Sequence, residues 1–359
     1  MQAEPESVLL LGIETSCDDT ATAVVRDGTT VLSSVSTNQD LFHAKYGGIV
    51  PEIASRQHLA LLSAAVEDAL DRAGTTLEAL DGIAVTAGPG LIGSLVVGVA
   101  TAKALAFATG KPLYAVNHLH GHVFAAFLES DRAPEYPFLT LLVSGGHSQV
   151  VRVDGPLRLR VLGRTRDDAA GEAFDKTARL LGLPFPGGPA IDALAREGDP
   201  KAVPFPRHRA ERGSLDMSFS GLKTAAKYFL DSPAGRAAKP ADVAASFQAA
   251  VVDVLIDRVD RAARGGGFKL AVLSGGVAAN SALQRAFTAW GRRFGIATAI
   301  PPLRYCTDNA AMIAAAADRQ GEALRADPRT LSADPNLRFE VQVDPIPHPQ
   351  HVETVDSAP

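Results

Sequence analysis

The chain has 359 residues, of which 46% are hydrophobic and 21% charged, and its formal net charge is −5. This composition gives enough material for two lobes with cores of their own, and the negative charge argues against a protein that coats nucleic acid nonspecifically. The two cysteines, Cys17 and Cys306, lie far apart and outside any CxxC pattern, which indicates a reducing compartment, the cytoplasm, and no disulfide framework.

The ends of the chain carry no targeting signal that we recognise. The apolar run at residues 8–13 is too short for a signal peptide or a membrane span, so we expect no membrane attachment. We expect residues 1–7 to be frayed and the Pro-rich residues 345–359 to be disordered.

Strands and helices alternate along the chain, which is typical of an α/β fold. Apolar runs predict strands at residues 8–13, 20–26, 138–143, 148–153 and 270–273. Helical spacing of apolar residues predicts helices at residues 56–73, 91–109, 241–263 and 309–319, with a further helix from Ala278.

Short polar turns follow three of these strands. Two turns, residues 14–19 and 144–147, separate consecutive strands, and the repeated pattern favours two duplicated lobes with a ligand cleft between them. The turn at residues 274–277 is again rich in glycine. Such turns expose backbone N–H groups, and so predict a phosphorylated ligand held from both lobes.

His118 and His122 are the most informative pair of residues. On a helix their i, i+4 spacing lies on one face, where both imidazoles could reach one metal ion. A zinc protease of the HExxH type would need Glu directly after the first histidine, but Leu119 stands there. The pair therefore favours a metal that orients and polarises a substrate, with a coincidental pair as the alternative.

Several carboxylates have two readings. Asp308, before the Ala-rich helix, is either a helix cap or the third ligand of the His118 and His122 metal, and spacing does not decide between them. Asp175 is either a solvated helix residue or a ligand of ribose hydroxyls. The rigid turn that contains Gly188 would press backbone against a flat ligand, and Asp192 follows it.

Basic residues gather in three places. Solvated faces explain such clusters, and contact with a phosphate backbone is the alternative. The clusters are Arg158, Arg160, Arg164 and Arg166; Arg207, His208, Arg209 and Arg212; and Lys223 with Lys227.

Eight ordered motifs between about residues 8 and 335 resemble the signatures of one family, the TsaD (Gcp) family of tRNA N6-adenosine threonylcarbamoyltransferases, formerly described as O-sialoglycoprotein endopeptidases. The motifs are residues 12–20 (GIETSCDDT), 51–58 (PEIASRQH), 88–95 (GPGLIGSL), 118–122 (HLHGH), 142–147 (LVSGGH), 167–176 (DDAAGEAFDK), 274–280 (SGGVAAN) and 307–310 (TDNA).

The resemblance implies the actin-like ATPase (ASKHA) fold. Its first lobe would span residues 8–117, completed by a C-terminal helix at about 309–335, and its second lobe residues 118–308. The implied substrate is L-threonylcarbamoyl-AMP, and the acceptor is N6 of adenosine 37 in tRNAs that read codons beginning with A. The implied partners are a TsaB-like paralogue and a TsaE-like P-loop ATPase.

The resemblance also implies site residues. One divalent metal, Fe2+ with Zn2+ or Mg2+ as alternatives, would be bound by His118, His122 and Asp308. His120 stands where many bacterial members carry Glu, and it adds a competing ligand, although i, i+2 residues face apart on a helix. The substrate contacts would fall on Leu142, Val143, Ser144, Gly145, Gly146, Asp175, Gly188, Asp192 and Asn280.

The chemistry of a mixed anhydride agrees with this, because its carbonyl is already electrophilic and needs no nucleophilic Ser or Cys. Glu14, Asp18 and Asp19 are candidates for the general base. Three alternatives remain at this point: an ATP-dependent small-metabolite kinase of the same fold, a metalloprotease, and a scaffold without activity.

Overall fold

The computed structural model describes residues 7–340 except 44–45, 47 and 212. The predicted frayed and disordered ends, residues 1–7 and 345–359, therefore lie outside the described residues apart from Ser7.

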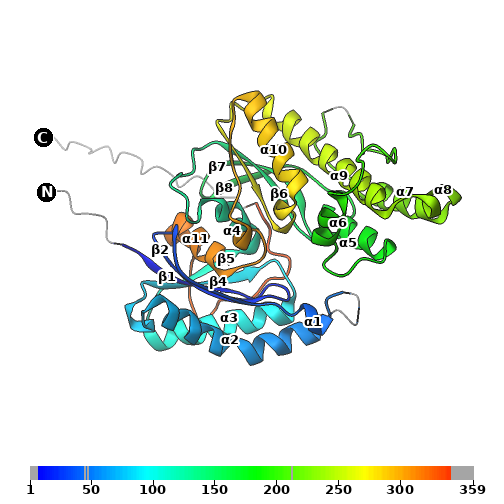
Figure 1. Cartoon of the computed structure of the whole chain (residues 1–359). Helices are drawn as coiled ribbons and strands as arrows, with labels where there is room; N and C mark the ends of the chain where they lie inside the picture. Colours follow the sequence, from blue (N-terminus) through cyan, green and yellow to red (C-terminus); the bar gives the residue numbers. More distant parts are fainter. Residues whose placement is uncertain (1–6, 44–45, 47, 212, 341–359) are drawn as a thin grey trace, which may run out of the picture.

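Six strands form the first sheet, in the spatial order β11-β5-β4-β1-β2-β3 (Figure 1). The central strand β1 pairs parallel with β4 and antiparallel with β2. The strands are β1 (Leu9–Glu14), β2 (Thr20–Arg26), β3 (Thr30–Thr37), β4 (Gly82–Gly88), β5 (Leu113–Asn117) and β11 (Arg325–Ala326).

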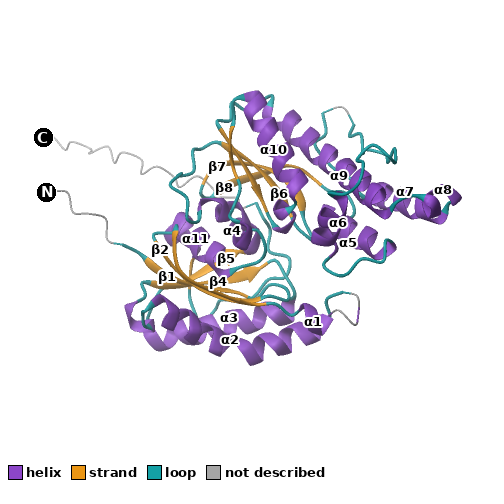
Figure 2. Ribbon diagram, in the orientation of Figure 1, coloured by secondary structure: helices purple, strands orange, loops and turns teal. Residues whose placement is uncertain are grey.

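Helices cover both faces of this sheet. On one face, α2 (Pro51–Ala73) packs on β2 and β3, and α3 (Ile92–Thr109) packs on β4 (Figure 2). On the other face, α11 (Ala310–Gln320) packs on β1 and β2. The short α1 (Asp40–His43) and the 3-10 turn η2 (Leu77–Ala79) complete this half.

Five strands form the second sheet, in the order β10-β9-β6-β7-β8. Its long helix α9 packs on β6 and β7. The strands are β6 (Phe138–Val143), β7 (Ser148–Gly155), β8 (Arg158–Arg164), β9 (Leu270–Ser274) and β10 (Ala297–Ala299). The helices are α5 (Ala170–Leu180), α6 (Gly187–Ala195), α7 (Ser220–Asp231), α8 (Pro233–Ala237), α9 (Pro240–Ala263) and α10 (Ser281–Phe294).

A shared apolar core joins the two sheets. It is built around α11 and α4 (His118–Phe124), with Phe127 and Phe138 among its fully buried members. Short 3-10 turns link these elements: η3 (Ala125–Phe127), η4 (Gly276–Ala279), η5 (Leu303–Tyr305) and η6 (Gly321–Leu324).

Gly12 shows how closely the first strand and the last helix approach each other. A Cβ added at Gly12 would lie 2.1 Å from the carbonyl oxygen of Ala310, the first residue of α11. A side chain cannot be accommodated there, so glycine sets the distance between β1 and α11.

After β11 the chain runs back across the molecule as a C-terminal strap, residues 331–340. The strap bonds to the first sheet where the amide of Asp334 donates to the carbonyl of Ala87 (2.8 Å). It reaches the second sheet where the amide of Val161 donates to the Glu340 carboxylate (2.8 Å). The strap therefore ties the two halves together.

The predicted strands and helices are confirmed, with shifted bounds at two helices. The helix expected from Arg56 begins at Pro51, because Pro is tolerated in the first turn of a helix. The helix expected from Ala278 begins at Ser281, after η4, with the Asn280 side chain as its cap. Arg158, Arg160 and Arg164, read from sequence as a basic cluster, lie on β8.

Within the described residues, α3 is the one helix long and apolar enough to cross a membrane by length and composition, and a third of it is buried. It packs on β4 and α2, as core helices of globular proteins do.

Candidate metal centre and nucleotide cleft

The helix α4 positions both histidines. It begins directly after β5, where the Asn117 side chain accepts the amide of Leu119 (2.9 Å) and so caps the helix. One turn then brings His118 and His122 onto the same face, with ring centroids 4.8 Å apart and nearly perpendicular. Both residues are buried, His122 almost completely.

Asp308 joins them from the segment before α11. Its Oδ1 lies 3.1 Å from His122 Nε2 and 3.5 Å from His118 Nε2. The cap of α11 is not Asp308 but Asn309, whose side chain accepts the amide of Met312 (2.9 Å). The structure therefore brings the three predicted metal ligands together, within 4.8 Å of one another.

This donor set fits a divalent metal. Two imidazole nitrogens and one carboxylate oxygen leave open positions, as in mononuclear iron and zinc sites. The donors come from two different segments, α4 and the turn before α11, and face one another across a small gap. A carboxylate and two imidazoles in such proximity and burial are readily bridged by a cation.

Charge shapes the protonation of this cluster. Burial alone would lower the pKa of His118, but the carboxylates of Glu14 and Asp308 outweigh it and raise this pKa to about 9. Burial likewise would raise the pKa of Asp308, but His118 and His122 hold it below its usual range. Without metal, a proton therefore occupies the centre at neutral pH.

We expect metal affinity to rise with pH for this reason. A metal must displace the His118 proton, so the apparent affinity should increase about tenfold per pH unit and level off above about pH 9. Titration of the metal-free protein with Zn2+ against a competing chelator, from about pH 7 to about pH 8.5, measures this. An affinity that does not change over this interval would contradict a protonated His118.

His120 is not part of the centre. Its Nε2 donates to the carbonyl of Phe339 (2.7 Å) in the C-terminal strap, and its Nδ1 accepts from Gln320 Nε2 (3.1 Å). Its ring packs edge-on against Phe339. The expectation of a competing ligand is therefore wrong, because both ring nitrogens are used on the reverse side of α4.

The three candidate bases lie in different surroundings. Glu14 is fully buried at the end of β1 and accepts hydrogen bonds from Thr86 Oγ1 (2.6 Å) and His118 Nδ1 (2.9 Å). Asp18 and Asp19 lie half-buried in the turn between β1 and β2, and Asp19 accepts from Asn38 (3.3 Å). Burial and these contacts argue against proton abstraction from a substrate by Glu14.

The glycine turns of the second sheet lie side by side, because β6 and β9 are parallel neighbours with Leu142 opposite Ser274. Gly145 and Gly146 are exposed, and a Cβ at either would meet no atom within 4 Å. Gly275 adopts φ +86°, and a Cβ there would lie 2.4 Å from the carbonyl of Val143. The turn with Gly145 and Gly146 is therefore open to a ligand, whereas Gly275 allows β6 and β9 to approach each other closely. Of the other predicted contacts in this turn, Ser144 is half-buried and Leu142 is a buried strand residue.

The remaining predicted substrate contacts gather on α5, α6 and the start of α10. Asp175 accepts the amide of Gly187 (2.8 Å), at the start of α6 and next to Gly188, and burial raises the pKa of Asp175. Asp192 accepts from Ser281 Oγ (2.8 Å), one residue after Asn280. Asn280 in turn donates to Gln248 (2.7 Å). These residues surround one corner of the second lobe.

His147 also belongs to the site, although its place in the motif at residues 142–147 predicted no role for it. It ends the turn after β6, and its amide donates to Ser144 Oγ (3.1 Å). Burial, and then the positive charges of His118 and His122, lower the pKa of His147 to about 4, so its ring is neutral. Only the fold brings it to the metal centre, so spacing in the sequence could not reveal this.

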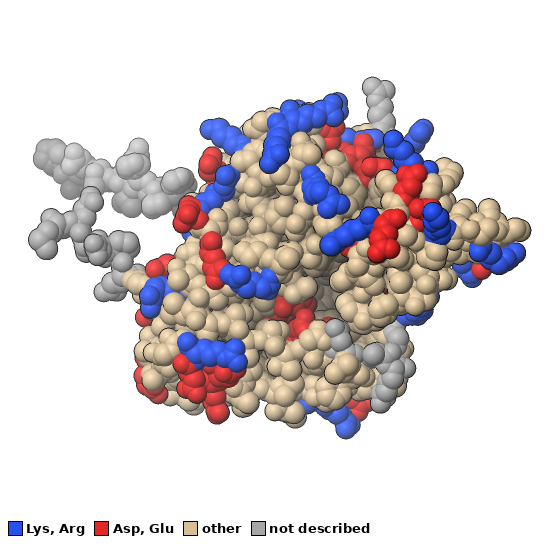
Figure 3. Space-filling model, viewed as in Figure 1, with Lys and Arg blue, Asp and Glu red and all other residues tan. Residues whose placement is uncertain are grey.

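The space-filling view shows a hollow between the lower and the upper right part of the molecule, with acidic side chains inside it (Figure 3). Three of the basic residues in the predicted clusters form ion pairs: Arg166 with Asp216, Arg207 with Asp253, and Lys223 with Asp168.

The chain is similar to known proteins over most of its length. The family model for TsaD, tRNA N6-adenosine threonylcarbamoyltransferase, matches residues 30–315. A protein of that name from Geobacter sp. (strain M21) is 54% identical over 313 residues, which are 87% of this chain and 91% of the relative. Another, from Anaeromyxobacter dehalogenans (strain 2CP-C), is 53% identical over 330 residues, which are 89% and 98% of the two chains.

Two solved structures share the fold. Full-length HypF in the phosphate- and nucleotide-bound form gives a TM-score of 0.57 at 13% identity, over 88% of this chain and 47% of HypF. (R)-2-Hydroxyglutaryl-CoA dehydratase component A from Acidaminococcus fermentans gives 0.52 at 16% identity, over 87% and 98%. At such identities the likeness bears on the fold alone, and the predicted two-lobed actin-like α/β fold is confirmed.

Proposed function

The chain belongs to the TsaD family of tRNA N6-adenosine threonylcarbamoyltransferases, and from that membership we infer the reaction that it catalyses. The enzyme transfers the threonylcarbamoyl group from L-threonylcarbamoyl-AMP to N6 of adenosine 37, in tRNAs that read codons beginning with A. The observation that carries this is the identity above 50% to relatives of that name over most of both chains. The kinase alternative is not favoured, because the name of those relatives specifies transfer of a threonylcarbamoyl group to tRNA and not of a phosphoryl group.

The reaction needs no covalent enzyme intermediate. The exocyclic amine attacks the carbamoyl carbon, the new C–N bond forms, the C–O bond to AMP breaks, and the amine loses a proton. Burial and the carboxylates of Asp18 and Asp308 raise the pKa of the Cys17 thiol, so Cys17 stays protonated and is a poor nucleophile. Direct attack is therefore the simplest route.

His118 Nε2, His122 Nε2 and Asp308 would hold a divalent metal, which we take to be Fe2+, with Zn2+ or Mg2+ as alternatives. The bound ion supplies Lewis-acid polarisation of acyl or phosphate oxygens. Asp308 also contributes the negative charge that favours a cation at this place.

We assign the AMP part of the substrate to the second lobe. The exposed backbone of Gly145 and Gly146 would donate to the phosphate, supported there by Leu142, Val143 and Ser144. The corner formed by Asp175, Gly188, Asp192 and Asn280 would receive the nucleoside. Asp18 and Asp19 stay the candidates for the general base.

The division into lobes at residues 8–117 with 309–335, and 118–308, is part of the proposal. It is supported by the strand membership of the two sheets. We place the enzyme in the cytoplasm, where tRNA is present.

A transfer assay tests the function. Labelled threonylcarbamoyl-AMP, unmodified tRNA and the purified chain are combined with the expected TsaB-like and TsaE-like partners, and label in tRNA is counted. Label that appears in this tRNA, but is lost when adenosine 37 is replaced by another base, supports the assigned acceptor. No label, with partners shown to be active, would reject the transferase and return the kinase to consideration.

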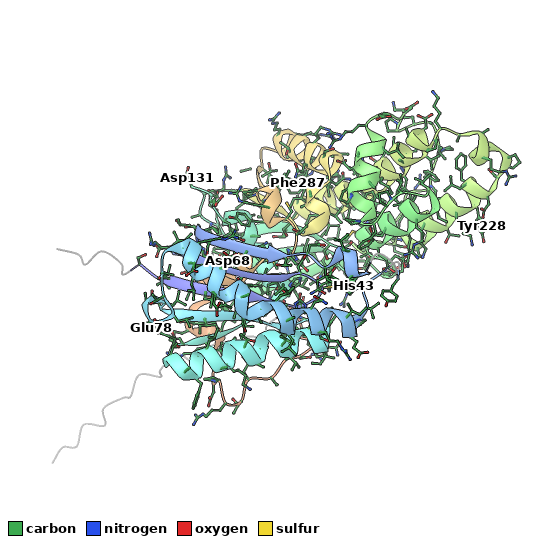
Figure 4. All side chains as sticks on the ribbon, turned by 60° about the horizontal axis from the view of Figure 1, so that its bottom comes forward. His43, Asp68, Glu78, Asp131, Tyr228 and Phe287 are labelled. Carbon is green, nitrogen blue, oxygen red and sulfur yellow. The ribbon has the colours of Figure 1, made fainter. Side chains whose placement is uncertain are left out.

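The outer face of α2 and α3 supports the proposed TsaB-like partner. The exposed stripe of α3 contains no charge, and its large members Ile92, Val96 and Phe107 are 50%, 50% and 75% exposed. Leu59 of α2 is 74% exposed beside it. Figure 4 looks onto these two helices in front of the first sheet. An exposed apolar helix stripe of this kind suits a helix pair, as a shorter relative of the same fold would offer.

We expect Val96→Glu to weaken the complex with the TsaB-like partner by roughly tenfold or more, because a charge would be buried at the centre of an apolar contact. Tyr228→Glu is the matched control, since Tyr228 is 70% exposed on α7, far from this face (Figure 4). Calorimetric titration of each variant with the partner measures the affinity. If both variants bound the partner with equal affinity, the partner would bind elsewhere. If Val96→Glu only disrupted a homodimer of this chain and still bound the partner, the face would serve self-association instead.

A further inference from the structure

We propose that Glu14 is a positioning residue for the metal centre, which holds the His118 imidazole in the tautomer and orientation that present Nε2 to the metal. The inference deepens the proposed function, because it requires that His118, His122 and Asp308 hold a metal ion. It gives Glu14 a role other than that of general base.

Glu14 reaches His118 from behind. The carboxylate is fully buried at the end of β1, and its Oε2 accepts from His118 Nδ1 (2.9 Å). Ser16 Oγ lies near the same nitrogen (3.1 Å). The other ring nitrogen, Nε2, points to Asp308 Oδ1 (3.5 Å). The imidazole therefore lies between a carboxylate on one side and the metal-binding gap on the other.

This contact decides which nitrogen carries the proton. A carboxylate can only accept, so Nδ1 of a neutral His118 must be the protonated nitrogen. Nε2 is then left with its lone pair directed at the gap, as a metal ligand requires. Such carboxylate–histidine–metal arrangements fix the ring and raise the basicity of the ligand.

His122 makes the contrast clear. Its Nδ1 is buried and has no hydrogen-bond partner among the described residues. No carboxylate therefore holds the His122 ring from behind, and the contact that His122 does make joins its Nε2 to Asp308 Oδ1 (3.1 Å), another of the three ligands. Of the two imidazoles, His118 is the one that the fold prepares in advance.

The surroundings of Glu14 require a carboxylate and reject an amide. Three donors converge on its two oxygens: the amide of Ser16, the hydroxyl of Thr86 and Nδ1 of His118. Glutamine has one accepting oxygen, so its NH2 group would face at least one of these donors. If NH2 faced His118, Nδ1 would have to accept, Nε2 would carry the proton, and the ligand would be lost.

The test compares metal binding by Glu14→Gln and Thr86→Val, measured by competition of Zn2+ with a chromophoric chelator. We expect Glu14→Gln to weaken Zn2+ binding by about 10- to 100-fold. Thr86→Val removes a donor from the same carboxylate oxygen but keeps the contact with His118, so its affinity should stay within about threefold of wild type. Equal losses in both variants would mean that general packing around β1 explains the effect, and no loss in Glu14→Gln would overturn the proposal.

A measurement on the wild type covers the case in which Glu14→Gln fails to fold. Imidazole 15N shifts of the Zn2+-loaded protein report the tautomer, with His118 identified by the resonance missing in His118→Ala. We expect a protonated Nδ1 and a coordinated Nε2, and the reverse assignment would overturn the proposal. Both experiments use neither tRNA nor threonylcarbamoyl-AMP, so their outcome is separate from that of the transfer assay.

Discussion

Asp308→Asn should reduce threonylcarbamoyl transfer by roughly 100- to 1000-fold. The substitution keeps the shape of the side chain but removes the anionic ligand, and metal polarisation of a reacting oxygen contributes several kcal/mol to a transition state. His118→Ala should have an effect of similar size, because it removes one of the two imidazoles at the same gap. The initial rate of label transfer to tRNA, with partners in excess, measures both.

Asp318→Asn is the matched control for Asp308→Asn. Asp318 lies on α11, the helix that Asp308 precedes, and burial raises the pKa of its carboxyl, so a neutral amide costs little there. This variant should transfer at the wild-type rate and bind Zn2+ normally. A normal transfer rate in Asp308→Asn, together with normal metal content, would remove Asp308 from the mechanism.

Gly12→Ala is expected to destabilise the protein by roughly 3 kcal/mol, at the upper end of overpacking effects. The new Cβ would lie 2.1 Å from the backbone oxygen of Ala310, and backbone in a helix cannot move aside as a flexible side chain would. α11 must shift, and with it Asp308. The midpoint of urea unfolding should fall, and Zn2+ binding should weaken in the remaining folded protein.

Gly221→Ala provides the comparison for this glycine. It lies in α7, and a Cβ there meets no atom within 4 Å. Alanine should leave stability unchanged or raise it by up to about 1 kcal/mol, since alanine is the better helix former. If both substitutions shifted the midpoint equally, the contact between β1 and α11 would not be the cause.

The sequence predicted several of the elements whose burial is continuous, but it missed the central strand β4, in which every residue is buried. The run at residues 9–14 reads as a central strand because nearly every side chain in it is buried on one face or the other. β8 was not predicted, because it is an edge strand with arginines at alternate positions, and its charge concealed its period of two. Local pattern thus identified some central strands but neither β4 nor the charged edge strand β8.

The site was predictable only as far as its residues belong to motifs. His118 and His122 follow from spacing on one helix, whereas their meeting with Asp308 depends on the packing of α11 against α4. Glu14 was singled out for its charge, but its contact with His118 depends on the pairing of β1 and β4 that also brings Thr86 close. His120 was misjudged because its partner, Phe339, is more than two hundred residues away.

The contact between β1 and α11, and the strap that follows, bear on the synthesis of the enzyme. Glu14 leaves the ribosome early, Asp308 and its helix come near the end, and Phe339 of the strap later still. A nascent chain can therefore build most of the second sheet while its metal ligands are still incomplete. The complete set of metal ligands exists only once residue 308 has been made, so a chain truncated before it cannot hold the metal through all three side chains.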